Sequence, residues 1–170
     1  MMIFKDADIE AAVKHCAAGK FRNAGQVCIS PTRFFIEEPV YDEFIKSFKS
    51  HVEAINVGDG LDSKSTMGPL VADRRLEVME DFISDAISSG GEVISGGGRG
   101  QSPGSFFEPT LIRDVPDTAK IMIEEPFGPV APSASFSSID EIIERANSLP
   151  FGLASYASVS YTHLRAHETT

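Results

Sequence analysis

The spacing of apolar residues along the chain predicts helices that alternate with strands. In four stretches, apolar residues recur three and four positions apart, as they do on the buried face of a helix. The predicted helices cover residues 9–19, 39–55, 73–88 and 138–146. Short apolar runs predict strands at residues 33–36, 93–94, 109–115 and 130–136, and a last strand that begins near residue 152. This alternation predicts an α/β fold in which helices cover a sheet.

Residues that favour helix ends support these boundaries. Asp6 and Asp8 precede the first helix, where a carboxylate can accept hydrogen bonds from the first amides, and we expect Gly19 to end that helix. Ser138 and Glu141 have the spacing of a capping box at the start of the last helix.

Composition constrains the partners and the location of the protein. The chain has 170 residues, with 15 lysines and arginines against 25 aspartates and glutamates, so its formal net charge is −10. This charge argues against nucleic acid and anionic membrane surfaces as partners, because both bind basic patches. The first residues lack the basic start and apolar stretch of a signal peptide. Two cysteines are too few for a disulfide scaffold, and we therefore expect a cytoplasmic protein.

The end of the chain differs in character from the rest. Residues 159–169 resemble the in-frame translation of a sequencing adapter. We therefore expect a domain at residues 1–157 and a non-native or disordered tail at residues 158–170. His163 and His167 have the spacing of a zinc-binding helix, but the first is followed by leucine where the zincin motif requires glutamate. We predict no metal site.

Cys28 is the first candidate for chemistry. It follows Gly25 in a predicted loop of small residues, where a thiol can be accessible and the backbone can turn sharply. The alternative is that Cys28 is a buried small apolar residue, as most single cysteines are. Cys16 lies on the apolar face of the first predicted helix, so we assign it to the core.

Glu125 and Phe127 form the second candidate. They lie in an acidic segment held rigid by Pro126 and Pro129. A carboxylate can accept two hydrogen bonds from a ribose, and a neighbouring ring can pack on a nicotinamide. The alternative is a solvated acidic turn before a strand. The glycine-rich residues 96–100 are interpreted as a connection rather than a phosphate site, because no predicted helix follows them.

Five segments, in order along the chain, together resemble the aldehyde dehydrogenase superfamily. The segments are Asn23–Cys28, Gly68–Leu70, Phe107–Leu111, Glu125–Pro129 and Phe151–Ala154. The first resembles the catalytic-cysteine motif of the family, and the fourth resembles its Glu-x-Phe-Gly-Pro cofactor motif. The resemblance covers residues 1 to about 157. It implies the three-layer α/β sheet of the family's catalytic domain, truncated at both ends.

The resemblance also implies a role for each candidate. Cys28 would attack the aldehyde carbon as a thiolate, and its backbone N–H would help to hold the oxyanion. Glu125 would bind the ribose hydroxyls of NAD or NADP, and Phe127 would pack near the nicotinamide. The family's general-base glutamate and its dinucleotide-binding domain lie before the matched residues, so we expect the isolated chain to be inactive. Ser30 departs from the motif, where Ala, Gly, Cys or Asn is usual.

Arg22 narrows the expected substrate. It stands six positions before Cys28, where succinate-semialdehyde dehydrogenases carry an arginine that binds the substrate carboxylate. A planar guanidinium suits a carboxylate better than an ammonium does. The alternative is a structural or surface ion pair. We therefore predict NAD(P)-dependent oxidation of an acidic semialdehyde through a cysteine thioester.

Other functions remain open at this point. A coenzyme-A-acylating relative would transfer the acyl group to the thiol of coenzyme A instead of to water. A catalytically dead interaction module would keep the fold without activity, and a thiol-based redox or acyl-transfer protein would need no nicotinamide. We expect a small aldehyde as the binding partner and a homo-oligomer as the full-length form.

Overall fold

The computed structural model describes residues 1–160, which fold around one six-stranded sheet. The strands are β1 (Met2–Ile3), β2 (Phe34–Glu37), β3 (Glu92–Ser95), β4 (Thr110–Arg113), β5 (Val130–Phe136) and β6 (Ala157–Ser158). Their order across the sheet is β3-β4-β5-β2-β1-β6. Among these six strands of residues 1–160, only β3 runs antiparallel to its neighbour, and the other pairs are parallel.

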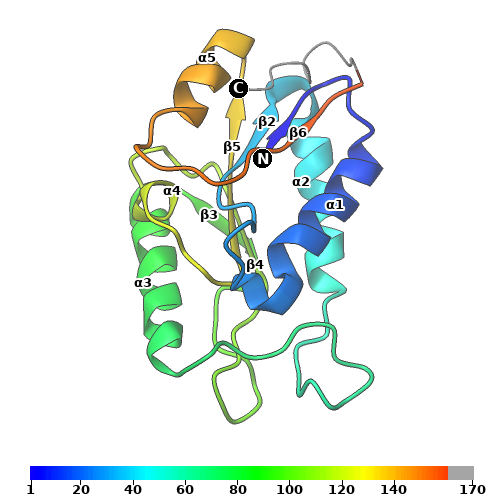
Figure 1. Ribbon diagram of the computed structural model, residues 1–170, viewed down its shortest axis with the longest axis vertical. Coiled ribbons are helices and arrows are strands. Elements are labelled where there is room, and N and C mark those ends of the chain that lie inside the picture. The colour runs from blue at the N-terminus through cyan, green and yellow to red at the C-terminus, as the bar shows by residue number, and fades with distance from the viewer. Residues whose placement is uncertain (161–170) are drawn as a thin grey trace.

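Helices cover both faces of this sheet (Figure 1). The helices are α1 (Ile9–Phe21), α2 (Tyr41–Glu53), α3 (Arg74–Ser88), α4 (Lys120–Ile123) and α5 (Ile139–Ala146), with short 3₁₀ turns η1 (Arg22–Gly25) and η2 (Glu38–Val40). Figure 1 shows α1 and α2 on one side of the sheet and α3, α4 and α5 on the other. The predicted three-layer α/β fold is therefore confirmed.

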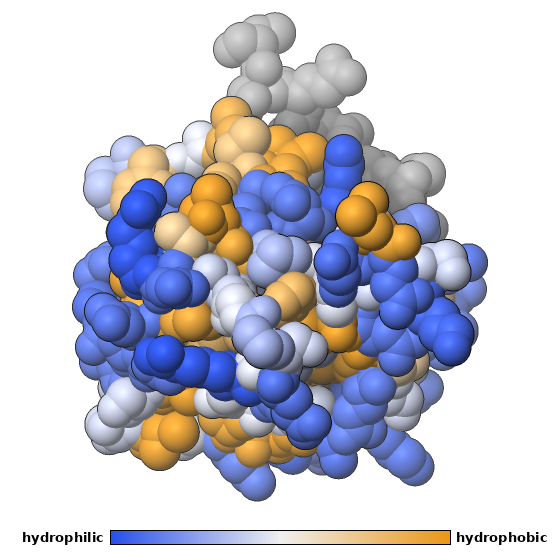
Figure 2. Space-filling view, turned by 90° about the horizontal axis from the view of Figure 1, so that it is seen from below, coloured by the Kyte–Doolittle hydropathy of each residue, from blue (hydrophilic) through white to orange (hydrophobic). Residues whose placement is uncertain are grey.

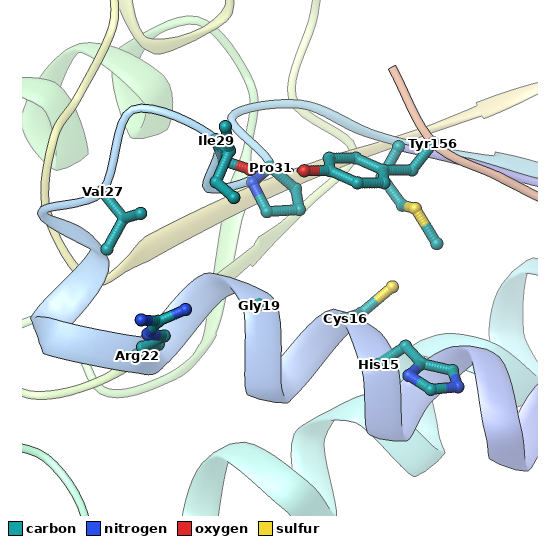
Figure 3. Close-up of a pocket in the computed structure, with 9 residues that line it drawn as sticks. His15, Cys16, Gly19, Arg22, Val27, Ile29, Pro31 and Tyr156 are labelled. Atoms are coloured by element: carbon teal, nitrogen blue, oxygen red, sulfur yellow. Dashed lines mark hydrogen bonds between the residues drawn. The ribbon is translucent and has the colours of Figure 1, made fainter. Parts of the chain in front are cut away.

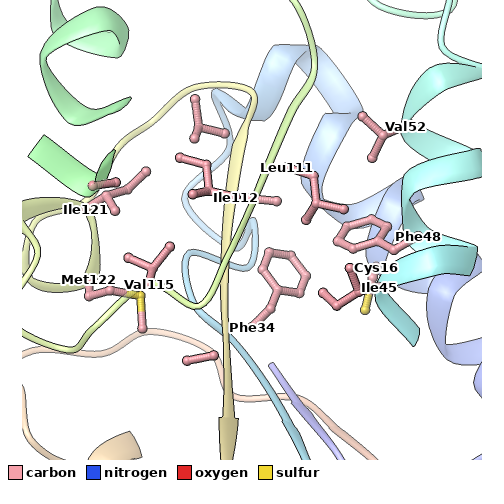
Figure 4. Packing of buried hydrophobic residues seen from close by; sticks show 14 of the residues in the cluster. Cys16, Phe34, Ile45, Phe48, Val52, Leu111, Ile112, Val115, Ile121 and Met122 are labelled. Carbon is pink, nitrogen blue, oxygen red and sulfur yellow. The ribbon is translucent and has the colours of Figure 1, made fainter. Parts of the chain in front are cut away.

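The buried core follows from this layering. All four residues of β2 are buried, as expected for a parallel strand covered on both faces. Figure 4 shows Leu111 of β4 on the side of Phe48 and Val52, whereas the adjacent Ile112 lies toward Ile121 on the other side of the sheet. Phe48 also packs against three further rings, those of Phe21, Phe34 and Phe44, at centroid distances of 6.2, 5.4 and 5.4 Å.

Both predicted helix caps are present. The Asp8 carboxylate accepts a hydrogen bond from the Ala11 amide at 3.0 Å. The Ser138 hydroxyl accepts one from the Glu141 amide at 3.2 Å, and the Glu141 carboxylate accepts from the amide of Ser137 at 2.9 Å. In the usual capping box, the glutamate accepts from the amide of the cap residue itself, whereas Glu141 accepts from Ser137, one residue before the cap.

Two predicted boundaries are wrong. Gly19 does not end α1, which continues to Phe21. Gly19 lies inside the helix instead, at a point where the Pro31 ring packs closely enough to contact a β-carbon. The last strand does not begin near residue 152, since residues 149–156 are irregular and β6 begins at Ala157.

The structure follows the chain slightly past the predicted domain end. Ser158 pairs with Ile3 in the sheet, and the Ser160 amide donates to the Asp6 carboxylate at 3.2 Å. The rest of the predicted tail, including His163 and His167, lies outside the described residues. Within residues 1–160, no helix is both long and apolar enough to span a bilayer, and no group of three or more acidic, histidine or cysteine side chains could hold a metal ion.

The end of the molecule that lies lowest in Figure 1 is seen directly in Figure 2. Apolar residues lie there in several separate patches with polar residues between them. On this face, polar residues therefore interrupt the apolar surface, and no single large apolar patch forms.

The aromatic cluster generates a prediction about stability. Phe48→Ala should lower the free energy of unfolding by about 3–5 kcal/mol, because it leaves a cavity among three other rings. Phe151→Ala is the matched control, since the Phe151 side chain is 60% exposed. Urea denaturation of both variants checks the prediction. Equal losses in the two variants would show that the cluster is not part of the stabilising core.

Candidate functional site

The loop that carries Cys28 begins with three residues in the left-handed region. At the end of α1, Asn23, Ala24 and Gly25 have φ angles of 51°, 54° and 72°. Such a run is costly for residues with a β-carbon. It is offset by hydrogen bonds to Gln26, whose amide donates to the Asn23 carbonyl at 3.1 Å and whose carbonyl accepts from the Asn23 side chain at 3.2 Å. The run reverses the chain sharply and leaves Cys28 exposed.

This loop packs backbone to backbone against the second candidate segment. A β-carbon on Gly25 would lie 2.1 Å from the Gly128 carbonyl oxygen. A β-carbon on Gly128 would in turn lie 2.2 Å from the Met79 sulfur of α3. Only glycine fits at position 25, where the clash is with backbone and φ is positive, whereas a side chain at position 128 would have to displace the Met79 thioether. The Cys28 loop and the turn at residues 124–129, called here the acidic turn, are therefore held side by side.

Gln26 connects a third motif segment to the same place. Its side-chain amide donates to the carbonyls of Asn23 and Pro69 at 3.1 and 3.4 Å. Its side-chain oxygen accepts from the Val71 amide at 2.8 Å. Three of the five motif segments thus converge, although they are separated by more than forty residues in sequence.

Glu125 and Phe127 are both exposed on the acidic turn. Among the described residues, Glu125 has no hydrogen-bond or ion-pair partner, so both of its oxygens are free to accept. Phe127 has a φ of 43°, and its side chain is 38% exposed. A free carboxylate two residues from an accessible ring fits the ribose and nicotinamide of a dinucleotide. The chemistry of these residues therefore matches the group that the sequence predicts.

Two residues beneath this site were not predicted from the sequence. The guanidinium of Arg75 in α3 donates hydrogen bonds to the carbonyls of Pro126 and Phe127. Lys20 of α1 is only 1% exposed, and burial lowers the pKa of its ammonium to about 7, although the nearby Glu125 carboxylate acts in the opposite direction. No sequence signal marks Lys20, which occupies the last turn of a helix where basic residues are common.

Ser30, which departs from the family pattern, is accommodated by a specific contact. It is buried, and its hydroxyl donates to the Lys20 carbonyl at 3.4 Å. The hydroxyl therefore connects the far side of the Cys28 loop to α1.

Arg22 lines a cavity of about 300 Å³ between α1 and the Cys28 loop (Figure 3). The loop contributes Val27, Ile29 and Pro31, which are apolar, and Tyr156 contributes its ring. The Tyr156 hydroxyl donates to the Ile29 carbonyl at 3.0 Å. Cys28 does not line this cavity, although both of its chain neighbours do. The structure therefore brings Arg22 to the Cys28 loop but not into one cavity with the thiol itself.

Cys16 and Cys28 have opposite environments. Cys16 is 1% exposed, and burial raises the pKa of its thiol to about 12, so it remains protonated at neutral pH. Cys28 is exposed on its loop. The assignment of Cys16 to the core is confirmed.

The glycine-rich segment is a connection between two strands. No helix follows residues 96–100, the Gly97 amide donates to the Thr110 hydroxyl at 2.9 Å, and Arg99 forms an ion pair with Glu80 at 2.7 Å. The segment connects β3 to β4, as interpreted from the sequence.

Comparison with known proteins identifies clear relatives. The aldehyde dehydrogenase family model matches residues 1–167. A probable succinate-semialdehyde dehydrogenase (NADP+) of Sinorhizobium fredii is 44% identical over 155 residues, which cover 91% of this chain and 32% of the relative. A glutarate-semialdehyde dehydrogenase of Pseudomonas aeruginosa is 41% identical over the same length, with the same coverage.

A solved structure agrees with these relatives. The crystal structure of succinate-semialdehyde dehydrogenase from Burkholderia pseudomallei superimposes with a TM-score of 0.94 and 38% identity, and the match covers 96% of this chain and 34% of that one. The chain therefore spans about a third of the length of the relatives it matches.

The contact between the two glycines generates a prediction. Gly25→Ala should lower the free energy of unfolding by at least about 1–2 kcal/mol from its left-handed conformation alone, and the collision with Gly128 adds to this loss. Gly60→Ala is the control, because no atom lies within 4 Å of a β-carbon there. Urea denaturation compares the two variants. If Gly25→Ala is as stable as Gly60→Ala, the loops are not packed as described.

The two thiols generate a second prediction. Iodoacetamide at pH 8 should label Cys28 well before Cys16, because Cys28 is exposed and the pKa of Cys16 is raised to about 12 by burial. Peptide mapping after timed quenching measures the order. In urea, where burial is lost, the rates should become similar. Labelling of Cys16 first in the folded protein would contradict the assignment.

Proposed function

The chain belongs to the aldehyde dehydrogenase family, and from this premise we propose that it supplies the nucleophile and the nicotinamide-side contacts of an NADP-dependent semialdehyde dehydrogenase. The packing of Gly25 against Gly128 carries the proposal, because it holds the Cys28 loop beside the acidic turn. NADP is proposed as the cofactor because the relative in Sinorhizobium fredii is named for it.

Cys28 is the proposed nucleophile. Its thiolate attacks the aldehyde carbon, a C–S bond forms, and the carbonyl electron pair moves to the oxygen. The backbone N–H of Cys28 donates to this oxyanion. The exposure of Cys28 supports this role, since the substrate must reach the sulfur.

Glu125 and Phe127 are the proposed cofactor contacts. The Glu125 carboxylate would accept hydrogen bonds from the nicotinamide ribose hydroxyls, and the Phe127 ring would pack near the nicotinamide. When bound, the dinucleotide supplies a hydride acceptor for the carbon attached to Cys28. The sulfur of Cys28 would then hold the oxidised acyl group as a thioester.

The acyl group of this thioester is then transferred to an acceptor, and the C–S bond to Cys28 breaks. We propose water, which releases the carboxylate and returns the thiol. The alternative acceptor is the thiol of coenzyme A, which would release an acyl-coenzyme A. Product analysis with and without coenzyme A separates these outcomes.

An acidic semialdehyde is the proposed substrate. Arg22 provides a guanidinium at a largely apolar cavity, which suits a short carbon chain that ends in a carboxylate. Two relatives are named for succinate and glutarate semialdehydes, which both have this form. The alternative is a structural role for Arg22, although the described residues give its side chain no ion pair.

Two further features concern the full-length form. We propose a homo-oligomer, because Ile139 and Ile143 of α5 are 47% and 54% exposed on a helix where apolar residues are usually covered. A cytoplasmic location is proposed because both described cysteines are free thiols.

Two rival functions make different predictions. A catalytically dead module would keep the fold but would not react with aldehydes. A thiol-based redox or acyl-transfer protein would react without a nicotinamide and would have no use for Glu125 and Phe127. A test in a complete enzyme distinguishes the proposed dehydrogenase from these two rivals.

A chimera provides that test. Residues 1–157 of this chain replace the matching third of the Burkholderia pseudomallei enzyme, whose structure superimposes closely. We expect the chimera to reduce NADP in the presence of succinate semialdehyde, and Cys28→Ala to abolish this activity. The isolated chain should be inactive. A chimera that folds and binds NADP, yet oxidises no aldehyde, would contradict the proposal.

The role of Arg22 generates a prediction in the same chimera. A hydrogen bond to a charged group contributes roughly 1.5–3 kcal/mol. Arg22→Ala should therefore lower kcat/KM for succinate semialdehyde by about 10- to 150-fold. Butanal, which lacks the carboxylate, should change little. Arg22→Lys should restore part of the loss, because an ammonium lacks the planar fork.

The ratio between the two substrates decides this prediction. General damage to the fold lowers both activities by the same factor and cancels in the ratio. An equal loss for succinate semialdehyde and butanal would assign Arg22 a structural role.

A further inference from the structure

Arg75 reaches the acidic turn from the opposite layer of the fold. It lies in the first turn of α3, whereas the Cys28 loop follows α1 on the other face of the sheet. Its Nη2 donates to the Pro126 carbonyl and, at 3.4 Å, to the Phe127 carbonyl. The two acceptors are the carbonyls on either side of the Phe127 Cα, so Arg75 contacts the backbone that orients the Phe127 ring and follows Glu125.

The turn that Arg75 holds is conformationally strained. Phe127 has a φ of 43°, in the left-handed region that bulky residues rarely adopt. Such a conformation persists only where surrounding contacts impose it. The contacts of Gly128 with Gly25 and Met79 fix the far end of the turn. The carbonyls of Pro126 and Phe127 themselves are fixed by Arg75.

Arg74 offers a direct comparison on the same helix. It is exposed, and its side chain has no hydrogen bond or ion pair within residues 1–160, whereas Arg75 is half-buried against the turn. The two neighbours have the same charge and length. Any difference between their substitutions therefore reports the contact with the turn.

We infer that Arg75 is a positioning residue for the cofactor site. Its guanidinium keeps Phe127 in the left-handed conformation and thereby presents the Glu125 carboxylate and the Phe127 ring outward together. This inference rests on the proposed function, since it assumes that Glu125 and Phe127 contact the dinucleotide. Arg75 itself touches only the backbone of the turn.

The first test measures the turn without any cofactor. The Thr110 amide donates to the Pro129 carbonyl at 2.8 Å, directly after the acidic turn, so its hydrogen exchange reports how well the turn is held. In the chimera, Arg75→Ala should exchange faster at Thr110, and Arg74→Ala should not. Equal exchange in the two variants overturns the inference, whatever the chimera's activity.

The second test measures the cofactor site. Calorimetry measures the Kd for NADP. Arg75→Ala should raise this Kd by roughly tenfold or more, because the variant loses a charged hydrogen bond that holds the turn in the conformation that binds. In steady-state assays KM for NADP should rise more than kcat falls, because saturating cofactor restores the outward conformation. Arg75→Lys should recover part of the affinity. Arg74→Ala should leave the Kd within about twofold of the unsubstituted chimera.

The outcomes separate this inference from the proposed function. Failure of the unsubstituted chimera to bind NADP contradicts the proposed function, whereas the exchange test still decides whether Arg75 holds the turn. Normal NADP affinity in Arg75→Ala overturns the inference and leaves the proposed function standing. If Arg75→Ala does not fold, Arg75→Lys carries the test, and an unchanged Kd together with unchanged Thr110 exchange in that variant overturns the inference.

Discussion

The contact between the backbones of Gly25 and Gly128 is the constraint on which the candidate site depends. It holds a loop that follows α1 against a turn that precedes β5, and the Gly128 carbonyl leaves no room for a side chain on Gly25. The proposed nucleophile and the proposed cofactor contacts lie within three residues of this contact. Residues about a hundred positions apart in sequence therefore lie side by side where these two glycines are in contact.

Both sides of the contact are held from opposite layers of the fold. From one face, α1 supplies Lys20, whose carbonyl accepts from Ser30, and η1 adds the left-handed run at residues 23–25. From the other face, α3 supplies Met79 behind Gly128 and Arg75 beneath the acidic turn. Strained backbone and a buried ammonium each cost stability. Strained backbone and a buried ammonium occur together around this contact, as is typical of functional sites.

The sequence predicted those features that depend on local chemistry. The sequence predicted the amphipathic patterns of α2 and α3 and the caps at Asp8 and Ser138, because each of these features depends on residues that are close together in the sequence. The motif around Cys28 and that around Glu125 were recognised in the same way. Cys28, Glu125 and Phe127 lie on exposed loops, which supports the roles proposed for them.

The features that the sequence did not predict depend on distant contacts. β1 was not predicted and β6 was placed too early, because strands of two residues have no alternating pattern; both exist through pairing, β1 with β2 and β6, and β6 with β1. Lys20 and Arg75 look like ordinary surface residues of their helices. Their burial becomes visible only when the Cys28 loop and the acidic turn fold over them.

The most direct measurement is rapid acid quenching of the chimera, followed by mass spectrometry of its peptides. The account predicts that succinate semialdehyde together with NADP produces a succinyl thioester on the peptide that contains Cys28. Omission of NADP should prevent the thioester, because no hydride can then leave. A succinyl group that forms on another residue, or that forms on Cys28 without NADP, would contradict the account.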